Sequence, residues 1–533
     1  MFDFTELSQR ANSFRFRSWD LLIIAVCILV GFTIQKRVKN RGRRLPPGPK
    51  PLPIIGNVRD FPEGFEATHW ASYKELYGSL SSVRAFGTTF IIINDFKIAT
   101  NLLEKRSMKY AERPVSTFGG KLCGFDMFLS NRPPGEEWRN ARKRVHDFIG
   151  TRSAMSRFND LLQLEGRKLL HCLLETPENF VEHYQSYAGA IILKLCFDYS
   201  ISRKGEDPLV GLGKRVLHIF SDSHSGLWLV DIFPALQYLP EWFPGANFKK
   251  VAKQYRSTTS EFIERPFKYV KSCLRGGAGL SFVSTELANT ASNAEEQQIK
   301  WITASLYGGG SDTTVSALRT FTLAIALHPE VSTEAQSEID RVVGMDRFPQ
   351  LSDRPNLPYV DAVLMESLRW NLVAPLGVPR ATQEDDYYDG YFIPKGAVII
   401  TNAWQICHDP TLYHDPFSFK PERFLRRGAR QPEPDPRKLI FGLGRRICPG
   451  KEFADDSLFV AMSMMLALLN IERARDSTGK VIVPEVEYSL GIISAPKEFR
   501  CSITPRSSTA AALIKTVLSE SAYDQDDSAD LPE

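Results

Sequence analysis

The distribution of apolar residues predicts strands in two short segments and helices over most of the remaining chain. Residues 80–93 (LSSVRAFGTTFIII) predict two strands that meet at Phe86-Gly87, because β-branched residues flank a turn-forming pair. Residues 387–403 (YYDGYFIPKGAVIITNA) repeat this pattern around Asp389-Gly390. Between residues 95 and 370 the apolar spacing is mostly helical, and the sequence contains no internal repeat.

One predicted helix is unusually long and has three glycines near its middle. Residues 292–295 (SNAE) have the spacing of a capping box, and the apolar pattern continues to about Leu327. Each glycine in 308–310 should cost about 1 kcal/mol relative to Ala inside a helix. Either a loop separates two helices here, or one long helix exposes its backbone to a bulky neighbour. The second alternative also explains Asp312 and Thr313 directly after the glycines, where Thr313 either bonds back to the helix or faces a ligand.

The amino-terminal residues 1–44 predict a membrane anchor with a basic flank. Residues 21–34 carry no charge, but as a helix they reach only about 21 Å against a hydrocarbon core of about 30 Å. A helix that starts at Phe14, with flanking charges that snorkel to the headgroups, is long enough to span. A cleavable signal peptide has an apolar run of similar length, but here the basic segment 36–44 follows instead of a cleavage site. This segment holds six basic residues and no acid, so we expect a single-pass anchor with the body in the cytosol.

The rest of the chain divides into a hinge, one large domain and a tail. Five prolines within residues 45–58 favour a stiff, extended hinge. Residues 59–505 contain no long linker and predict one domain, and the Ser- and Asp-rich residues 506–533 predict a disordered tail. The net charge of +4 gives no case for nucleic-acid binding. The eight cysteines form no C-x-x-C pair, which argues against a disulfide framework and favours a reducing compartment.

The loop 438–450 (KLIFGLGRRICPG) surrounds the most unusual of these cysteines, Cys448. Its glycines, Gly450 among them, allow the backbone to approach a flat ligand closely, and Phe441 can shield the sulfur. Two arginines and the start of an apolar helix after Gly450 favour the thiolate. The alternative is a buried structural cysteine in a glycine-rich turn. A Walker A loop is excluded, because the glycine spacing is one residue too long and the required Ser or Thr is missing.

The pattern Phe441-x-x-Gly444-x-Arg446-x-Cys448-x-Gly450 resembles the haem-binding signature of the cytochrome P-450 family, in which the cysteine thiolate is the axial ligand of the haem iron. Other motifs of this family occur in the family's order along almost the whole chain. They are Trp138-x-x-x-Arg142, Gly309-Gly310-x-Asp312-Thr313-Thr314, Glu366-x-x-Arg369 and Pro421-Glu422-Arg423-Phe424. The chain is most similar to membrane-bound fungal members, especially those of secondary metabolism.

The resemblance implies the cytochrome P-450 fold, which is mainly α with a small β-rich lobe, with haem between the long helix and the cysteine loop. Cys448 is then the metal ligand, and Asp312 with Thr313 is the catalytic pair that delivers protons during oxygen activation. The implied cofactor-binding residues are Trp138, Arg142, Arg380, Phe441, Arg446, Cys448 and Gly450; Trp138 and the three arginines face the haem propionates. Glu366, Arg369 and Arg423 form a buried triad with a folding role.

The resemblance also implies where the substrate and the electron donor bind. Mostly apolar segments line the substrate site, namely 118–128, 301–309, 373–378 and 490–493. No G-x-G-x-x-G sequence is present to hold FAD or NADPH, so electrons must come from another protein. We expect an NADPH–cytochrome P-450 reductase to dock on basic residues that the resemblance places near the proximal side, although a solvated face is their default interpretation. These residues are Arg139, Lys143, Arg437, Lys438, Arg445 and Lys451.

The expected function is an NADPH- and dioxygen-dependent monooxygenase in the endoplasmic reticulum membrane, acting on a lipophilic small molecule. A terpenoid is favoured as substrate, with an aromatic polyketide or indole as the alternative. A second class is a haem-thiolate isomerase, dehydratase or peroxide-user that needs no reductase, and a third is a noncatalytic haem sensor or carrier. Asp312 and Thr313 favour the first class. A metal cluster at Cys407, His408 and His414 is a weaker hypothesis, because the family uses this stretch as a structural segment.

Overall fold

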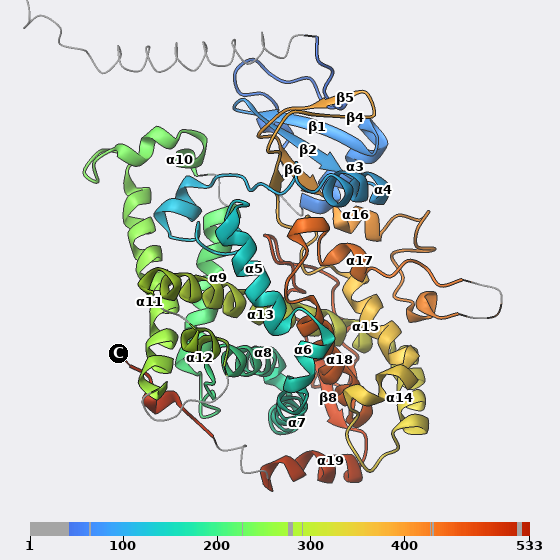
Figure 1. Ribbon diagram of the computed structural model, residues 1–533. Coiled ribbons are helices and arrows are strands. Elements are labelled where there is room, and N and C mark those ends of the chain that lie inside the picture. Colours follow the sequence, from blue (N-terminus) through green and yellow to red (C-terminus); the bar gives the residue numbers. More distant parts are fainter. Residues whose placement is uncertain are drawn as a thin grey trace, which may run out of the picture.

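The computed structural model describes residues 42–62, 66–225, 228–274, 281–289, 292–426, 428, 431–519 and 525–532. Helices form a broad body, and most of the short strands form a lobe at one edge of it (Figure 1). The longer helices are α3 (Glu66–Tyr77), α5 (Glu136–Ile149), α7 (Asn159–Glu175), α8 (Phe180–Phe197), α9 (Pro208–Ser225), α11 (Asn247–Cys273), α13 (Asn293–Leu327), α14 (Pro329–Val342), α15 (Pro358–Trp370) and α18 (Lys451–Leu468). The mainly α fold with a small β-rich lobe is therefore confirmed.

Shorter helical segments connect these elements. They are α4 (Phe96–Thr100), α6 (Arg152–Met155), α10 (Leu229–Ile232), α12 (Phe282–Ala288), α16 (Ala403–Cys407), α17 (Arg437–Ile440) and α19 (Ser508–Lys515), the π-helical turns η2 (Asn101–Lys105) and η3 (Thr117–Leu122), and the 3-10 turns η9 (Pro421–Phe424) and η10 (Gly444–Arg446). The segments α17 and η10 belong to the cysteine loop, and η2 packs against η10. These three segments therefore position the candidate site.

Helix α13 runs through the centre of the body. It packs along α8 and is also contacted by α9, α11, α12, α15 and α18. Its N-cap is Ser292, whose side chain accepts a hydrogen bond from the backbone N–H of Glu295, and the helix continues without interruption through residues 308–310. Of the two alternatives, the single long helix is correct. Most of its residues are buried, so its central place comes from apolar packing on all sides.

The main sheet has the strand order β1-β2-β6-β3, formed by β1 (Leu80–Ala85), β2 (Thr88–Ile93), β6 (Val398–Thr401) and β3 (Arg380–Ala381). β1 and β2 are antiparallel, as predicted, and Phe86 and Gly87 between them have φ values of 47° and 80°. β2 is parallel to β6, and β3 is antiparallel to it, with Arg380 opposite Ile399. This pairing brings Arg380 to the side of the lobe that faces the helical body.

Two smaller hairpins complete the strands. β4 (Asp386–Tyr388) and β5 (Tyr391–Ile393) are antiparallel about Asp389 and Gly390, whose φ values are 50° and 75°. Two successive positive φ values suit the twist of a tight hairpin, and this turn was predicted from the Asp-Gly pair. β7 (Leu469–Arg473) and β8 (Cys501–Pro505) pair beside α13 and α18.

The predicted anchor at 1–44 lies outside the described residues except for 42–44. From residue 42 onward, none of the helices that the structure describes is long and apolar enough to cross a bilayer. The Pro-rich segment runs along β1, where Ser82 donates from its backbone N–H to the Pro47 carbonyl and from Oγ to the Pro46 carbonyl. These bonds fix the start of the segment to the β-rich lobe.

The carboxyl-terminal residues differ from the prediction of a disordered tail at 506–533. Residues 508–515 form α19, capped by Ser507, and Ala510 and Ile514 are buried against the core. Further on, Asp527 donates from its backbone N–H to the Ser200 carbonyl, and its carboxylate accepts from the Ser200 N–H. The few apolar residues of this polar stretch are sufficient to dock it, because their contacts are with the body rather than with one another.

Candidate active site

Cys448 lies between η10 and the start of α18. The backbone N–H of Cys448 donates to the carbonyl of Phe441 at 2.7 Å, which closes the loop. Gly444 has φ of 57°, and a Cβ there would overlap the carbonyl oxygen of Leu103 in η2. Gly450, the N-cap residue of α18, has no other atom within 4 Å of an added Cβ. Gly444 is thus required for packing against η2, while Gly450 faces open space.

The surroundings of the Cys448 thiol raise its pKa. The residue is exposed, although the surrounding protein raises the pKa of its thiol through desolvation. The backbone N–H of Gly450 and the charge of Arg142 lower this pKa, but their effect is smaller than that of burial. The helix start and a nearby arginine therefore favour the thiolate, as expected, but burial has the larger effect on this pKa. A metal cation on the sulfur would provide the missing stabilisation of the negative charge.

Four arginines gather near this loop without an acidic partner. Arg142, Arg380 and Arg446 were predicted, and Arg113 joins them. Burial is the main cause that lowers the pKa of each, and neighbouring arginines lower it further for Arg113, Arg380 and Arg446. The pKa values of Arg380 and Arg446 fall to about 10. Within the described part of the chain, none of the four forms a salt bridge with a carboxylate, so this cluster suits an anionic ligand such as the two propionates of haem.

Backbone carbonyls hold these arginines in place. Arg446 donates to the carbonyls of Ala111 and Arg132, each at 2.7 Å. Arg380 donates to the Leu443 carbonyl at 2.8 Å, and Arg142 to the Ile447 carbonyl, next to the cysteine, also at 2.8 Å. Such bonds orient the guanidinium groups without neutralising them, and the nearby carboxylate of Glu112 offsets the charge of Arg446 only in part.

Trp138 and Arg113 complete the cluster. The guanidinium of Arg446 lies 4.4 Å from the Trp138 ring centroid and that of Arg142 lies 5.3 Å from it, so both positive charges interact with the same ring. Arg113 donates to the carbonyls of Ser130 and Val378, each at 2.7 Å. The sequence analysis missed Arg113 because it follows no motif spacing. Trp138 and Arg142 also line a pocket with Arg139, Gly444 and Arg445.

The donor set as a whole fits haem. Cys448 would bind the iron, Arg113, Arg142, Arg380 and Arg446 would hold the propionates, and Gly450 leaves room beside the sulfur. Phe441 acts through its carbonyl, which anchors the cysteine loop. The predicted residues are therefore brought together from α5, β3 and the loop before α18.

Asp312 and Thr313 lie directly after the glycines of α13. The Thr313 hydroxyl donates to the carbonyl of Gly309 at 2.8 Å, so of the two sequence-based alternatives the structure shows the back-bonded one. Gly309 is exposed in the middle of an otherwise buried helix, and no atom lies within 4 Å of an added Cβ. Gly310 has a different role, because a Cβ there would lie 2.9 Å from Ile192 Cδ1 of α8. The open face of α13 is therefore that of Gly309 and Thr313, which are one turn apart.

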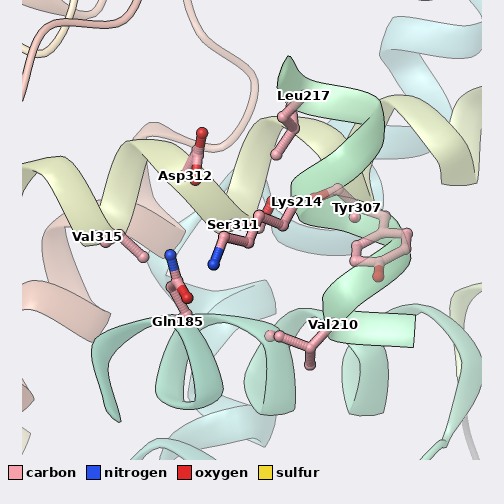
Figure 2. A pocket seen from close by; sticks show the side chains of 10 residues that line it. Gln185, Val210, Lys214, Leu217, Tyr307, Ser311, Asp312 and Val315 are labelled. Atoms are coloured by element: carbon pink, nitrogen blue, oxygen red, sulfur yellow. Dashed lines mark hydrogen bonds between the residues drawn. The ribbon is translucent and has the colours of Figure 1, made fainter. Parts of the chain in front are cut away.

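Asp312 lies beside a pocket between three helices. Figure 2 shows Asp312 and Ser311 on α13, Gln185 on α8 and Lys214 on α9 around this pocket. Burial raises the pKa of the Asp312 carboxyl, and the positive charges of Arg319 and Lys214 lower it by less. Because its pKa is raised, this carboxyl keeps its proton up to a higher pH than an exposed Asp does.

The predicted triad is present and fully buried. Arg369 Nε donates to Glu366 at 2.7 Å, and Arg423 Nε donates to the same carboxylate at 3.1 Å. Glu433, which the sequence analysis did not single out, accepts from Arg423 Nη1 at 2.6 Å. These bonds tie α15 to η9 and support a folding role for the triad.

The basic residues expected on the docking face separate into two groups. Arg139, Lys143, Lys438 and Arg445 are exposed, and Lys451 at the start of α18 is half-buried. Arg437 instead points inward, where it pairs with Asp435 and Asp455 at 2.9 and 3.1 Å, and its pKa is raised by these carboxylates despite burial. Arg437 is therefore a structural residue and no part of an exposed basic face.

The segments expected to line the substrate site differ in exposure. Phe118 is fully buried and stacks on Trp228 with ring centroids 3.6 Å apart. Phe128 contacts Trp301 edge to face at 6.0 Å, whereas Leu490 is largely exposed. The sequence analysis did not identify Trp228, because its place opposite Phe118 depends on the fold. At the predicted weaker metal cluster, the ring of His408 stacks on Trp404, and no metal-binding group of three or more ligand side chains occurs in the described ranges.

Comparison with known proteins agrees with this site. The fold and the cysteine loop with its arginines define a haem-thiolate protein, and the family model for cytochrome P-450 matches residues 46–501. The chain is 44% identical over 479 residues to cytochrome P-450 monooxygenase claR of Ampulloclitocybe clavipes, covering 90% of this chain and 89% of that protein. It is 39% identical to cytochrome P-450 monooxygenase CLM2 of Gibberella zeae, covering 95% and 98%. It is 35% identical to the O-methylsterigmatocystin oxidoreductase of Aspergillus flavus, covering 96% and 98%.

The chain therefore belongs to the cytochrome P-450 family, and the predicted family is confirmed. It is an oxidoreductase of the monooxygenase type, with haem bound through a cysteine thiolate as its cofactor. Monooxygenases of this family use a lipophilic substrate, dioxygen and a redox partner.

Proposed function

We propose that this protein is an NADPH- and dioxygen-dependent monooxygenase that receives electrons from a separate NADPH–cytochrome P-450 reductase. The observation that supports it most directly is the placement of Asp312 and Thr313 beside the open face of α13, where a hydroxyl and a perturbed carboxyl are consecutive. Haem with a thiolate ligand supplies the activation of dioxygen. Proton supply is the task left to the residues of this chain.

In this proposal Thr313 and Asp312 act in sequence. The Thr313 hydroxyl now donates to the carbonyl of Gly309, and rotation about χ1 turns the same hydroxyl toward the open face. Asp312 borders the pocket lined by Lys214 and Gln185, from which it can take a proton to replace the one that Thr313 releases. Burial raises the pKa of Asp312 and so favours the protonated carboxyl, the form that can donate a proton.

The electron donor is expected to dock on the exposed basic residues near the cysteine loop. Arg139, Lys143, Lys438 and Arg445 present four positive charges on this side, and they complement an acidic partner. Of these four residues, Arg445 lies nearest to Cys448 in the sequence. Salt should weaken this association by screening the exposed charges.

A terpenoid is the favoured substrate. The expected lining includes Phe118, packed behind it on Trp228, and Phe128 in contact with Trp301, so this region is apolar and has few hydrogen-bonding groups. Such a wall selects by shape and apolar area. An aromatic polyketide or indole is the alternative, and a panel that contains all three scaffold types distinguishes them by the product formed.

The experiment that tests the proposal compares Thr313→Ala with Thr314→Ala. Both hydroxyls donate to the carbonyl four residues earlier, so the neighbouring variant is a matched control for the loss of that bond. NADPH consumed, peroxide formed and product formed are measured with a microsomal reductase. We expect Thr313→Ala to divert electrons into peroxide and Thr314→Ala to stay coupled.

Two results would overturn the proposal. Unchanged coupling in Thr313→Ala removes that hydroxyl from proton supply. Product formation without NADPH and dioxygen moves the protein to the class of isomerases, dehydratases or peroxide-users.

We also propose that residues 1–44 anchor the protein in the endoplasmic reticulum membrane with the catalytic domain in the cytosol. The uncharged run at 21–34 and the six basic residues at 36–44 support this orientation. Protease added to intact microsomes should digest the main body without detergent. Full protection of the body would contradict the orientation.

A further inference from the structure

A hairpin near the carboxyl terminus connects α13 to α9 across the expected substrate region. Residues 487–497 close on themselves, with Ser489 N–H donating to the Ala495 carbonyl and Lys497 N–H to the Glu487 carbonyl, each at 2.8 Å. At the tip, a Cβ on Gly491 would lie 3.0 Å from Ser221 Oγ of α9. This hairpin contains 490–493, one of the segments expected to contact the substrate.

Two residues of α13 anchor the base of this hairpin. The Ser316 hydroxyl donates to the Ser494 carbonyl at 2.5 Å, and Arg319 Nη2 donates to the Pro496 carbonyl. Ser494 is fully buried, and its N–H donates to the Val373 carbonyl, so the same anchor reaches a second expected substrate segment. The hairpin thus rests on α13 through one neutral and one charged donor.

Arg319 is also the charged neighbour of Asp312 on the same helix. The two residues are seven positions apart, which places them two turns apart on one face of α13. The positive charge of Arg319 lowers the pKa of the Asp312 carboxyl against the effect of burial. Arg319 Nε is buried and has no hydrogen-bond partner among the described residues, and the carboxylates of Glu182 and Glu498 act on the same guanidinium.

We propose that Arg319 is a positioning residue that couples the 487–497 hairpin to Asp312, so that a substrate that displaces the hairpin changes proton supply. The inference rests on the proposed function of Asp312. Because the guanidinium is held by the Pro496 carbonyl, movement of the hairpin moves a positive charge on the face of α13 that also carries Asp312. Ser316 also anchors the hairpin but carries no charge. Its substitution therefore separates loss of the anchor from loss of the positive charge.

The first measurement is hydrogen exchange of the hairpin amides in the haem-loaded full chain. Loss of one hydrogen bond from a charged donor should accelerate exchange roughly tenfold or more in Arg319→Met. Ser316→Ala should accelerate it less, and Arg319→Lys should restore part of the protection. Arg473→Met is the matched control, because Arg473 Nη2 donates to the Leu327 carbonyl at the far end of α13. This control should leave the hairpin unchanged.

The second measurement needs no substrate. With NADPH and reductase, the fraction of consumed dioxygen released as peroxide reports proton supply. We expect Arg319→Met and Ser316→Ala each to change this fraction, and Ser316→Ala to have no further effect once Arg319 is Met, because no guanidinium then links the hairpin to the surroundings of Asp312.

The outcomes separate this inference from the proposed function. Additive effects of the two substitutions, or a changed peroxide fraction with unaltered hairpin exchange, overturn the coupling by Arg319. An unchanged fraction in Asp312→Asn instead overturns the proposed role of Asp312. If Arg319→Met fails to bind haem, the same cycle is carried out with Arg319→Lys, where a peroxide fraction equal to wild type together with faster exchange overturns the inference.

Discussion

The substitution Glu366→Gln measures how strongly the buried triad supports the fold beside the cysteine loop. The Glu366 carboxylate is fully buried and accepts from Arg369 at 2.7 and 2.8 Å, from Arg423 at 3.1 Å and from the backbone N–H of Lys420 at 2.8 Å. Glutamine has nearly the same shape, but it removes the charge and turns an N–H₂ group toward arginine donors. Removing one partner of a buried ion pair costs about 3–5 kcal/mol. Glu433 still neutralises Arg423, so we expect the free energy of unfolding to fall by about 3 kcal/mol.

Urea unfolding of the full chain, followed by far-ultraviolet circular dichroism, measures this loss. The matched control is Glu487→Gln, because its pair with Lys497 spans 2.8 Å between side chains that are 54% and 61% exposed. An exposed pair of this kind contributes about 0–1 kcal/mol. The reasoning would be refuted if the losses in free energy of unfolding for Glu366→Gln and for the control differed by less than about 1 kcal/mol, the value of an exposed pair. If Glu366→Gln does not accumulate, Glu366→Asp keeps the charge and should lose less stability than any neutral replacement.

Three further predictions concern the cysteine loop and its surroundings. Gly444→Ala should lose more stability in urea unfolding than Gly479→Ala: at both positions the positive φ strains an alanine by about 1–3 kcal/mol, but only at Gly444 does the added Cβ overlap another residue. Arg113→Gln should leave folding intact and release haem to an acceptor protein roughly tenfold faster, and an unchanged rate would remove Arg113 from the cluster. Burial raises the pKa of Asp456 to about 6, so ionisation of this carboxyl destabilises the folded protein as the pH rises from about 4 through 6. Asp456→Asn should therefore increase the free energy of unfolding by more at pH 7.5 than at pH 4. Equal effects at the two pH values would contradict this.

Local signals predicted those parts of the fold that depend on neighbouring residues. The hairpin turns at Phe86-Gly87 and Asp389-Gly390 both have positive φ at two successive positions, which their glycines favour. The start of α13 follows from the cap at Ser292, which satisfies a free N–H of the first turn. The cysteine loop was identified from its spacing, because glycine and cysteine positions there are set by a single short turn.

Contacts between distant segments were not predictable in the same way. Arg113 joins Arg142, Arg380 and Arg446 only after four separate segments have folded together. Arg437 has the sequence environment of a surface charge, yet Asp361 and Asp455 come from other helices to pair with it. A charge near a motif therefore predicts little about its own exposure until the acids of other elements are placed.

The three glycines of α13 show why one sequence signal can have several physical causes. Their joint cost in helix stability suggested a single reason, namely room for a bulky neighbour. The structure separates them: Gly310 allows Ile192 of α8 to pack closely, whereas Gly309 has open space where its side chain would be. The Gly309 carbonyl also accepts the Thr313 hydroxyl, so both the open space and the hydroxyl belong to the same turn. The close packing of Ile192 on Gly310 thus fixes the position of this turn against α8. Gly309 leaves the space into which the Thr313 hydroxyl can rotate.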